Sequence, residues 1–400
     1  MALMPVEEAR TRILAGVKPL AMENIALALA LGRVLAKRLS AGRDQPPFNA
    51  SAMDGFALRA PDVAALPATL KVIGTSAAGH AFSGKLKPGE AVRIFTGAPV
   101  PATADAIVIQ ENTVSSGHSV TVLQSVRAGQ NIRPRGLDFR KGEQLLPAAI
   151  QLNARDIGLA AAMNRNSISV RRKPVVAVIA TGDELVLPGG KPRADQIVSS
   201  NSNALAAMAQ AFGCEVINCG IVSDNLKATE RAVLKVAMAD VLLTTGGASV
   251  GDHDFVQQAL KNAGVKIDFW KIALRPGKPF MYGRKGKQHV MGLPGNPVSA
   301  LVCARLFLKP LVNAMLGLPV DDVVSTARLG AAMAANDGRQ DYVRASLAVA
   351  PDGSRTATPF GKQDSSMQRT FRDAHCLIVR PPNAPEATAG DLVSILNLDF

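Results

Sequence analysis

The clearest pattern in the chain is an alternation of short apolar runs with amphipathic segments between residues 173 and 316. Val175–Ala180 is a continuous apolar run, which is typical of a strand buried on both faces. Strand–helix alternation at this spacing predicts a mostly parallel, doubly wound sheet with right-handed crossovers. Further strands are expected at Glu215–Val222, Val241–Thr245 and Val290–Leu293, and helices at Asn201–Phe212, Leu226–Met238, Asp254–Asn262 and Val298–Leu316.

Two segments with a helical pattern flank a stretch of different character. Apolar residues recur at helical spacing through residues 5–41, until Pro46-Pro47 would stop a helix, and residues 154–163 again resemble one. Residues 47–147 instead hold short alternating runs separated by glycine and proline, which favours a β-rich domain. This arrangement predicts a β-rich domain inserted into a helical one.

The chain is therefore predicted to be a multidomain α/β protein. Its last part, residues 320–400, holds several short strand patterns with Asp352-Gly353 as a hairpin turn. The predicted domains are a helical domain split between residues 1–45 and 148–172, an inserted β-rich domain at 46–147, a central α/β domain at 173–318 and a C-terminal β domain at 319–400.

Composition narrows the class of ligand. The 45 Lys and Arg residues exceed the 32 Asp and Glu residues, and this formal charge of +13 favours an anionic ligand. The basic residues are scattered and aromatic residues make up only 4%, so nucleic-acid binding is not expected. The cysteines lack C-x-x-C spacing and the histidines lack H-E-x-x-H, which argues against zinc. Without a signal-like start or a long uncharged apolar run, we expect a cytoplasmic protein with no membrane segment.

Three polar or glycine-rich loops follow predicted strands, at Thr181–Glu184, Thr244–Asp254 and Gly292–Pro297. In open α/β sheets, ligands bind beyond the carboxyl ends of the strands. Glycines let backbone N–H groups close on an oxyanion, and a helix N-terminus after the middle loop would add positive potential. The loops therefore indicate a phosphate site, although none is a Walker A loop or a dinucleotide fingerprint. The alternative is that the glycines only form tight turns.

Acidic residues gather near these loops, at Asp183, Glu184, Asp224, Asp252 and Asp254. Carboxylates beside a phosphate usually need a cation to offset their repulsion, and Mg²⁺ prefers oxygen ligands and bridges to phosphates. Helix capping is the alternative for the last two acids.

Three further groups of charged residues are candidates for the site. Lys271 and Arg275 would share a face of an extended chain, which favours an anion site over a basic surface strand. In the β-rich insertion, Asp54 lies at a glycine turn and Asp138 lies among arginines. A surface ion pair is the alternative for each of these two acids.

These segments together resemble the molybdopterin molybdenumtransferase family, which includes the C-terminal E domain of gephyrin. The matching stretches occur in the family's order and span nearly the whole chain, and eight in register are strongly specific. They are Ser51–Ala57, Ile94–Pro101 with Asp105, Arg133–Gly142, Ile179–Leu185, Ser200–Asn203, Asp240–Asp254, Lys271–Pro279 and Gly292–Ala300.

The resemblance implies four domains, of which the last is β-barrel-like, and a homodimer with its active cleft between the central domain of one subunit and the inserted domain of the other. It implies that adenylyl-molybdopterin and molybdate are the substrates, that Mg²⁺ is the cofactor, and that AMP is released as the metal joins the dithiolene. A molybdoenzyme or an adenylyltransferase is a further partner that the resemblance suggests.

The resemblance also assigns roles to individual residues. It implies oxyanion-binding or acidic catalytic roles for one set, contacts to the pterin substrate for a second set, and Mg²⁺ ligation for a third. The first set is Asp54, Asp138, Glu184, Asp224, Asp254, Lys271 and Arg275, the second is Thr96, Thr181, Gly247, Ser249, Lys278, Pro294 and Pro297, and the third is Glu184, Asp224 and Asp254; Ser365 or Ser366 matches a family position in the last domain.

The chain departs from the family pattern at Asn49-Ala50, at Ser199 and at Arg275, where lysine is frequent. Arginine keeps the positive charge but changes the donor geometry. Three alternatives remain at this point: a molybdopterin adenylyltransferase, which shares the central domain, a non-catalytic pterin-binding scaffold, and a form that handles tungstate instead of molybdate.

Overall fold

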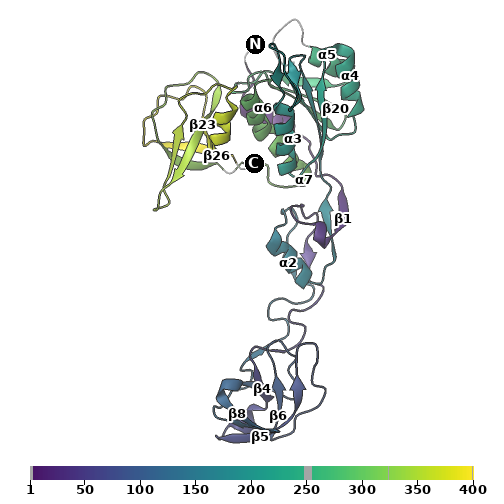
Figure 1. The fold of residues 1–400 in the computed structure, drawn as a ribbon, viewed down its shortest axis with the longest axis vertical. Coiled ribbons are helices and arrows are strands. Elements are labelled where there is room, and N and C mark those ends of the chain that lie inside the picture. Colours follow the sequence, from purple (N-terminus) through teal and green to yellow (C-terminus); the bar gives the residue numbers. More distant parts are fainter. Residues whose placement is uncertain (1–2, 247–254, 323, 399) are drawn as a thin grey trace. The chain divides into compact units, whose positions relative to one another are not determined.

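The computed structural model describes residues 3–246, 255–322, 324–398 and 400. The chain forms two compact units, one made of residues 1–23, 32–34 and 171–400, and the other of residues 24–31 and 35–170. Figure 1 shows the ribbon of both, coloured along the sequence.

The central sheet of the first unit has the strand order β16-β13-β17-β21-β20-β18. Its first four strands pair in parallel, as predicted, and β20 and β18 extend it in antiparallel orientation. The antiparallel edge was not predicted. The strands are β13 (Val175–Thr181), β16 (Glu215–Val222), β17 (Val241–Thr245), β18 (Lys266–Trp270), β20 (Met281–Lys285) and β21 (Gln288–Leu293).

Helices cover both faces of this sheet, as a doubly wound fold requires (Figure 1). The helices are α3 (Asn201–Ala211), α4 (Leu226–Lys235), α5 (Phe255–Asn262), α6 (Pro297–Cys303) and α7 (Lys309–Leu316). The last two form one helical run through a π-helical turn at Ala304–Leu308. This run is long and apolar enough to cross a membrane, but 83% of its most apolar window is buried inside the protein, as expected of a core helix.

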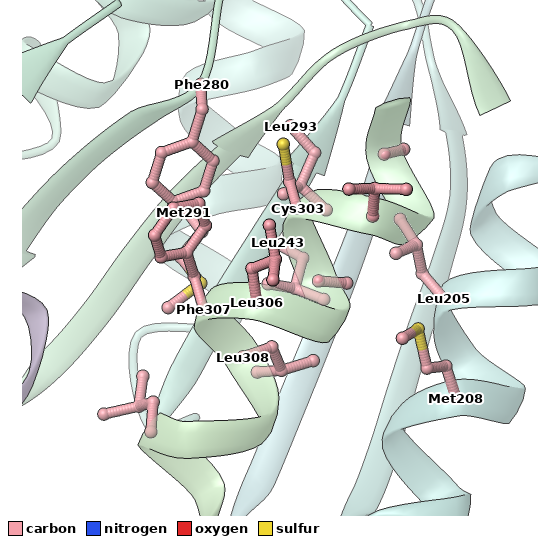
Figure 2. Packing of buried hydrophobic residues seen from close by; sticks show 14 of the residues in the cluster. Leu205, Met208, Leu243, Phe280, Met291, Leu293, Cys303, Leu306, Phe307 and Leu308 are labelled. Atoms are coloured by element: carbon pink, nitrogen blue, oxygen red, sulfur yellow. The ribbon is translucent and has the colours of Figure 1, made fainter. Parts of the chain in front are cut away.

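Alternate residues of each central strand point into two separate cores, because side chains in a strand alternate between faces. Val176 and Val178 of β13 pack with α1 (Val6–Leu14), α3 and α6 in one core. Ala177 and Ile179 pack with α4 and α5 in the other. Figure 2 shows the first core, where the rings of Phe280 and Phe307 stack with centroids 4.5 Å apart.

The predicted helix over residues 5–41 is wrong beyond its first turns. The helix α1 ends at Leu14, and β1 (Met22–Ala26) then pairs with β12 (Ser167–Arg171), 140 or more residues away in the chain. The Ala- and Leu-rich segment after β1 forms only a short 3-10 turn at Leu27–Leu29. Pairing with a distant strand overrides the weak helical preference of such residues. By contrast, α2 (Ala154–Ala162) lies where a helix was predicted and begins with a capping box formed by Asn153 and Asp156.

The β-rich stretch of the second unit was predicted correctly as β structure. Its main sheet has the order β7-β4-β6-β5-β9-β8, and two small pairs, β10-β3 and β11-β2, lie outside it. The strands are β2 (Leu39–Ser40), β3 (Ala50–Ser51), β4 (Gly55–Leu58), β5 (Ala68–Ser76), β6 (Glu90–Ile94), β7 (Ala106–Ile109), β8 (Thr113–Ser116), β9 (Ser119–Val122), β10 (Ile132–Arg133) and β11 (Gln144–Leu146).

The last part of the chain forms a closed barrel, in agreement with the expected β-barrel-like domain. The strands follow the order β23-β24-β22-β26-β25, and a further pairing of β25 with β23 closes the ring. The short β19 (Leu274–Arg275) lies parallel to β23 at its edge. The barrel strands are β22 (Ser325–Leu329), β23 (Gln340–Val349), β24 (Arg355–Pro359), β25 (Cys376–Arg380) and β26 (Leu392–Asn397), and α8 (Gln368–Asp373) precedes β25.

Candidate functional site

A cleft of about 930 Å³ lies where the parallel strands of the central sheet end. The loops after β13, β17 and β21 all contribute to it, which confirms that the three predicted loops meet. The loop around Pro276 and the loop before α8 form other parts of its wall. Of the site residues predicted from the sequence, the lining includes Thr181, Glu184, Arg275, Lys278, Pro294, Pro297, Ser365 and Ser366.

Two strand-end loops approach each other so closely that one position excludes a side chain. Gly246 has φ +94°, and a Cβ there would lie 2.1 Å from the carbonyl oxygen of Thr181. Only glycine fits such a position without strain. Beside it, the Oγ1 atoms of Thr181 and Thr244 are buried, and neither has a hydrogen-bond partner among the described residues. Thr181 is among the residues that line the cleft.

The first residue of α3 ties the second loop to the third. Asn201 Nδ2 donates to Thr245 Oγ1 at 2.9 Å and to the carbonyl of Gly295 at 2.7 Å. Thr245 Oγ1 in turn donates to the carbonyl of Pro294 at 3.3 Å. This network fixes Pro294 and Gly295 relative to the end of β17.

Asp183 and Asp224, two of the predicted acids of the central domain, lie next to each other in the described part of the chain. The backbone N–H of Asp224 donates to Asp183 Oδ1 at 3.1 Å, and that of Asp183 donates to Asp224 Oδ2 at 3.4 Å. Partial burial raises the pKa of the Asp224 carboxyl, and the negative charges of Asp183 and Glu184 raise it further. Glu184 is exposed and lines the cleft. Excess negative charge of this kind is what a bound cation would relieve.

No group of three His, Cys, Asp or Glu side chains in the described residues has the arrangement of a metal site. Asp254, the third predicted ligand, lies outside the described residues, as do Gly247 and Ser249. Mg²⁺ commonly binds through only one or two carboxylates and completes its coordination with water and substrate phosphates, so Glu184 and Asp224 fit its chemistry.

The segment from Lys271 to Lys278 is not extended in the way that the sequence predicted. Lys271 has φ +70°, so the chain turns between β18 and β19, and its Nζ lies 4.1 Å from the centroid of the Trp270 ring. It is not among the residues that line the cleft, whereas Lys278 is exposed there. The prediction that Lys271 and Arg275 share a face of an extended chain is therefore wrong, because a left-handed residue interrupts the strand.

Arg275 lines the cleft but is already paired with acids. Its Nε donates to Asp341 Oδ1 at 2.7 Å and its Nη2 to Asp341 Oδ2 at 2.5 Å, while Nη1 lies 3.7 Å from Asp337 Oδ2. The Asp341 hydrogen bond holds the pKa of the Arg275 guanidinium above its ordinary value. The planar two-point contact explains why arginine suits this position, since a lysine would make only one such contact.

The last domain contributes a wall that the sequence identified only at Ser365 and Ser366. Asn296 Nδ2 donates to Ser365 Oγ at 2.8 Å, and Gln368 Nε2 donates to Ser200 Oγ at 2.6 Å. Arg344, which is 1% exposed, supports this wall from beneath through Gln363 Oε1 at 2.9 Å and the carbonyl of Asp364 at 2.7 Å.

Arg344 and Gln363 were missed in the sequence. The available signal was a lone arginine among the apolar residues of the segment Tyr342–Ala345, at a place where the strand faces inward. Burial lowers the pKa of the Arg344 guanidinium, and the nearby Asp364 opposes this effect.

In the second unit, the structure brings Asp54 and Thr96 into direct contact. The Thr96 backbone N–H donates to Asp54 Oδ1 at 2.7 Å, and Thr96 Oγ1 donates to the same oxygen at 2.8 Å. These bonds lower the pKa of the Asp54 carboxyl, with a smaller contribution from Arg93. Asp138 is exposed on a neighbouring segment, where its backbone N–H donates to the carbonyl of Gln45 at 2.9 Å.

Comparison with known proteins gives the whole chain one consistent assignment. Residues 4–164 match the model of the MoeA N-terminal region (domain I and II), residues 177–314 that of a probable molybdopterin binding domain, and residues 326–398 that of the MoeA C-terminal region (domain IV). A molybdopterin molybdenumtransferase of Haemophilus influenzae is 33% identical over 98% of this chain and 98% of the relative.

The chain belongs to the molybdopterin molybdenumtransferase (MoeA) family. A second relative of the same name, from Nostoc, is 35% identical over 94% of this chain and 88% of its own length. A MoeA structure from Pyrococcus horikoshii superimposes with a TM-score of 0.87 at 29% identity and covers 100% of both chains. Membership in the MoeA family confirms the resemblance found in the sequence.

Proposed function

We propose that this chain is a molybdopterin molybdenumtransferase, which inserts molybdenum from molybdate into adenylyl-molybdopterin and releases AMP. The observation that carries the proposal is full-length similarity to transferases of that name, joined to a cleft with phosphate-binding features at the carboxyl ends of the central strands. The presence of all three MoeA regions favours this reaction over pterin adenylylation, for which the central domain alone would be the shared part.

The cleft residues bind and orient the anionic substrate. The side chain of Lys278 is available to phosphate oxygens. Pro294 and Pro297 shape the wall, and the Asn201 network holds that wall in place. Phosphoanhydride cleavage depends mainly on positioning and charge neutralisation, so no nucleophilic side chain is needed.

Glu184 and Asp224 would hold Mg²⁺, which when bound neutralises phosphate charge and stabilises the leaving group. Burial raises the pKa of the Asp224 carboxyl and the charges of Asp183 and Glu184 raise it further, and a bound cation would offset that repulsion. The dithiolene sulfurs come from the substrate, so the buried cysteines Cys303 and Cys376 need take no part.

The second unit carries three predicted site residues that are proposed to complete the site in a homodimer. In the chain, each of these site residues directly follows an exposed large apolar residue. Met53, before Asp54, is 42% exposed; Phe95, before Thr96, is 39% exposed; and Leu137, before Asp138, is 60% exposed. We propose that Asp54, Thr96 and Asp138 act in a cleft shared with a second copy, and that the enzyme works in the cytoplasm.

The test is turnover of purified adenylyl-molybdopterin with molybdate and Mg²⁺, measured as AMP release and as metal bound to pterin. Wild type and Asp54→Asn are compared, with Asp62→Asn of the same unit as a matched control. Molybdate-dependent AMP release that is lost only in Asp54→Asn supports the proposal. Tight binding of adenylyl-molybdopterin without AMP release would instead identify a binding scaffold and defeat it. Replacing molybdate with tungstate determines which oxyanion is preferred.

A further inference from the structure

Arg93, a residue that the proposed reaction does not use, contacts both chain segments that carry Asp54 and Thr96. It lies in β6 directly opposite Phe56 of β4 in the antiparallel pairing. Its Nη1 donates to the carbonyl of Gly55, the residue after Asp54, at 3.2 Å. Its guanidinium also lies 4.9 Å from the ring centroid of Phe95, the residue before Thr96. One side chain therefore bridges the two segments.

Further contacts fix the orientation of the Arg93 guanidinium. Its carbon lies 5.0 Å from the Phe56 ring centroid, so the ring of a β4 residue and the ring of the residue just after β6 both contact it. Its Nη2 donates to Gln110 Oε1 at 2.7 Å, and the backbone N–H of Gln110 donates to the carbonyl of Asp54 at 3.1 Å. Gln110 therefore gives Arg93 a second, indirect connection to the backbone of Asp54.

The segment around Asp54 has little freedom on its other side. A Cβ at Gly55 would lie 1.9 Å from the carbonyl oxygen of Val108, so β4 and β7 approach closely there. Thr96 is exposed and precedes Gly97, whose φ is +81°. The backbone N–H groups of Phe95 and Gly97 donate to the carbonyls of Ser76 and Ser51. The Arg93 guanidinium adds the side-chain contact to the Phe95 ring on this side.

We infer that Arg93 is a positioning residue for the proposed reaction: it holds the Asp54 and Thr96 segments at the separation that lets both Thr96 donors bind one carboxylate oxygen. The inference rests on the proposed function of Asp54. Arginine is required because its planar fork can contact a carbonyl, an amide and two rings at once, which a lysine ammonium cannot. Misplacement of a site residue by about 1 Å can cost roughly 100-fold in rate.

The test compares Arg93→Gln, Arg93→Lys and the matched control Arg127→Gln, which replaces an exposed arginine of the same unit. We expect Arg93→Gln to lower kcat for AMP release by about 10- to 100-fold, with KM within threefold of wild type and an unchanged thermal transition. Arg93→Lys should keep less than a third of wild-type kcat, and the control should be fully active. Wild-type kcat in both Arg93 variants, or a rise in KM that accounts for the whole loss, would overturn the inference. Should Arg93→Gln not fold, the same criteria apply to Arg93→Lys.

A crystal structure of Arg93→Gln separates failure of this inference from failure of the proposed function. If the wild-type enzyme releases no AMP, the proposed function is wrong. The crystal structure of Arg93→Gln then still tests whether Arg93 positions Asp54 and Thr96. Loss of either Thr96 hydrogen bond to Asp54 supports the inference. Retention of both bonds at their present lengths overturns it, whatever the activity.

Discussion

His289 gives the first prediction, because it is a buried, uncharged histidine in the central sheet. It is 4% exposed, and its Nδ1 lies 2.8 Å from the Tyr282 hydroxyl, which accepts from Arg284 Nε at 2.7 Å. The hydroxyl can donate its one proton either to Nδ1 of a neutral imidazole or to the carbonyl of Ile13 at 3.4 Å. Burial lowers the pKa of His289 to about 4, and the charge of Arg284 acts in the same direction.

The sign of the effect follows from proton binding. Between pH 4 and pH 6.5 the unfolded chain binds a proton at His289 and the folded chain does not, so the free energy of unfolding falls as the pH drops. A fall in the pKa from 6.5 to about 4 corresponds to roughly 3 kcal/mol at most. Between pH 7.5 and pH 5 the loss from this residue is about 2 kcal/mol.

The assay is urea unfolding of wild type and His289→Asn at pH 7.5 and pH 5, followed by the fluorescence of Trp270. This residue is the only tryptophan and lies in β18, so its signal reports the central domain. Asparagine keeps an acceptor for Tyr282 without the titration. The wild type should lose about 2 kcal/mol more than the variant on acidification, since other groups titrate alike in both. Equal losses would refute the reasoning.

Three other predictions concern packing at the site. Gly246→Ala should lower the free energy of unfolding by about 2 kcal/mol or more, through steric conflict with Thr181 and the left-handed backbone, as measured by urea unfolding. Gly55→Ala should lower the thermal transition of the second unit in calorimetry, because its Cβ would overlap the Val108 carbonyl. Arg344→Met should cost about 1–3 kcal/mol, because it leaves the Asp364 carbonyl unpaired and removes one of the two hydrogen bonds that Gln363 Oε1 accepts. It should also weaken substrate binding in calorimetric titration; unchanged binding would contradict a role of this loop in the cleft.

The central domain was predictable because its signals are local. Each apolar run that becomes a β strand is short and bounded by polar loops, and the strands from Val175 and Val241 begin where they were predicted. The three loops follow from the rule that ligands bind at the carboxyl ends of parallel strands. Asp54 and Thr96, 42 residues apart, were assigned to one site only through family resemblance, and the structure shows the contact.

The remaining features depend on partners distant in sequence. The segment at Met22–Ala26 has helical spacing but forms a strand because β12 supplies its hydrogen bonds. Lys271 does not share the predicted face with Arg275, because its own left-handed backbone interrupts the extended chain. Arg344 appears in the sequence as one charge in a strand, and only the fold shows that it supports Gln363.

The hydrogen bonds that join the central domain to Ser365 and to Gln368, the first residue of α8, have a consequence for protein engineering. A chimera that replaces the barrel of this chain with that of a relative would bring in a new partner for Asn296 and Ser200. Such a graft would bring its own inner core, but Tyr342, Leu377 and Leu396 of the present barrel pack in the core of the central domain and would also need matching residues. It would restore the cleft only if the donor also carried equivalents of Ser365 and Gln368. The unit of exchange in this protein is therefore the barrel together with the first turns of α3 and α6, rather than the barrel alone.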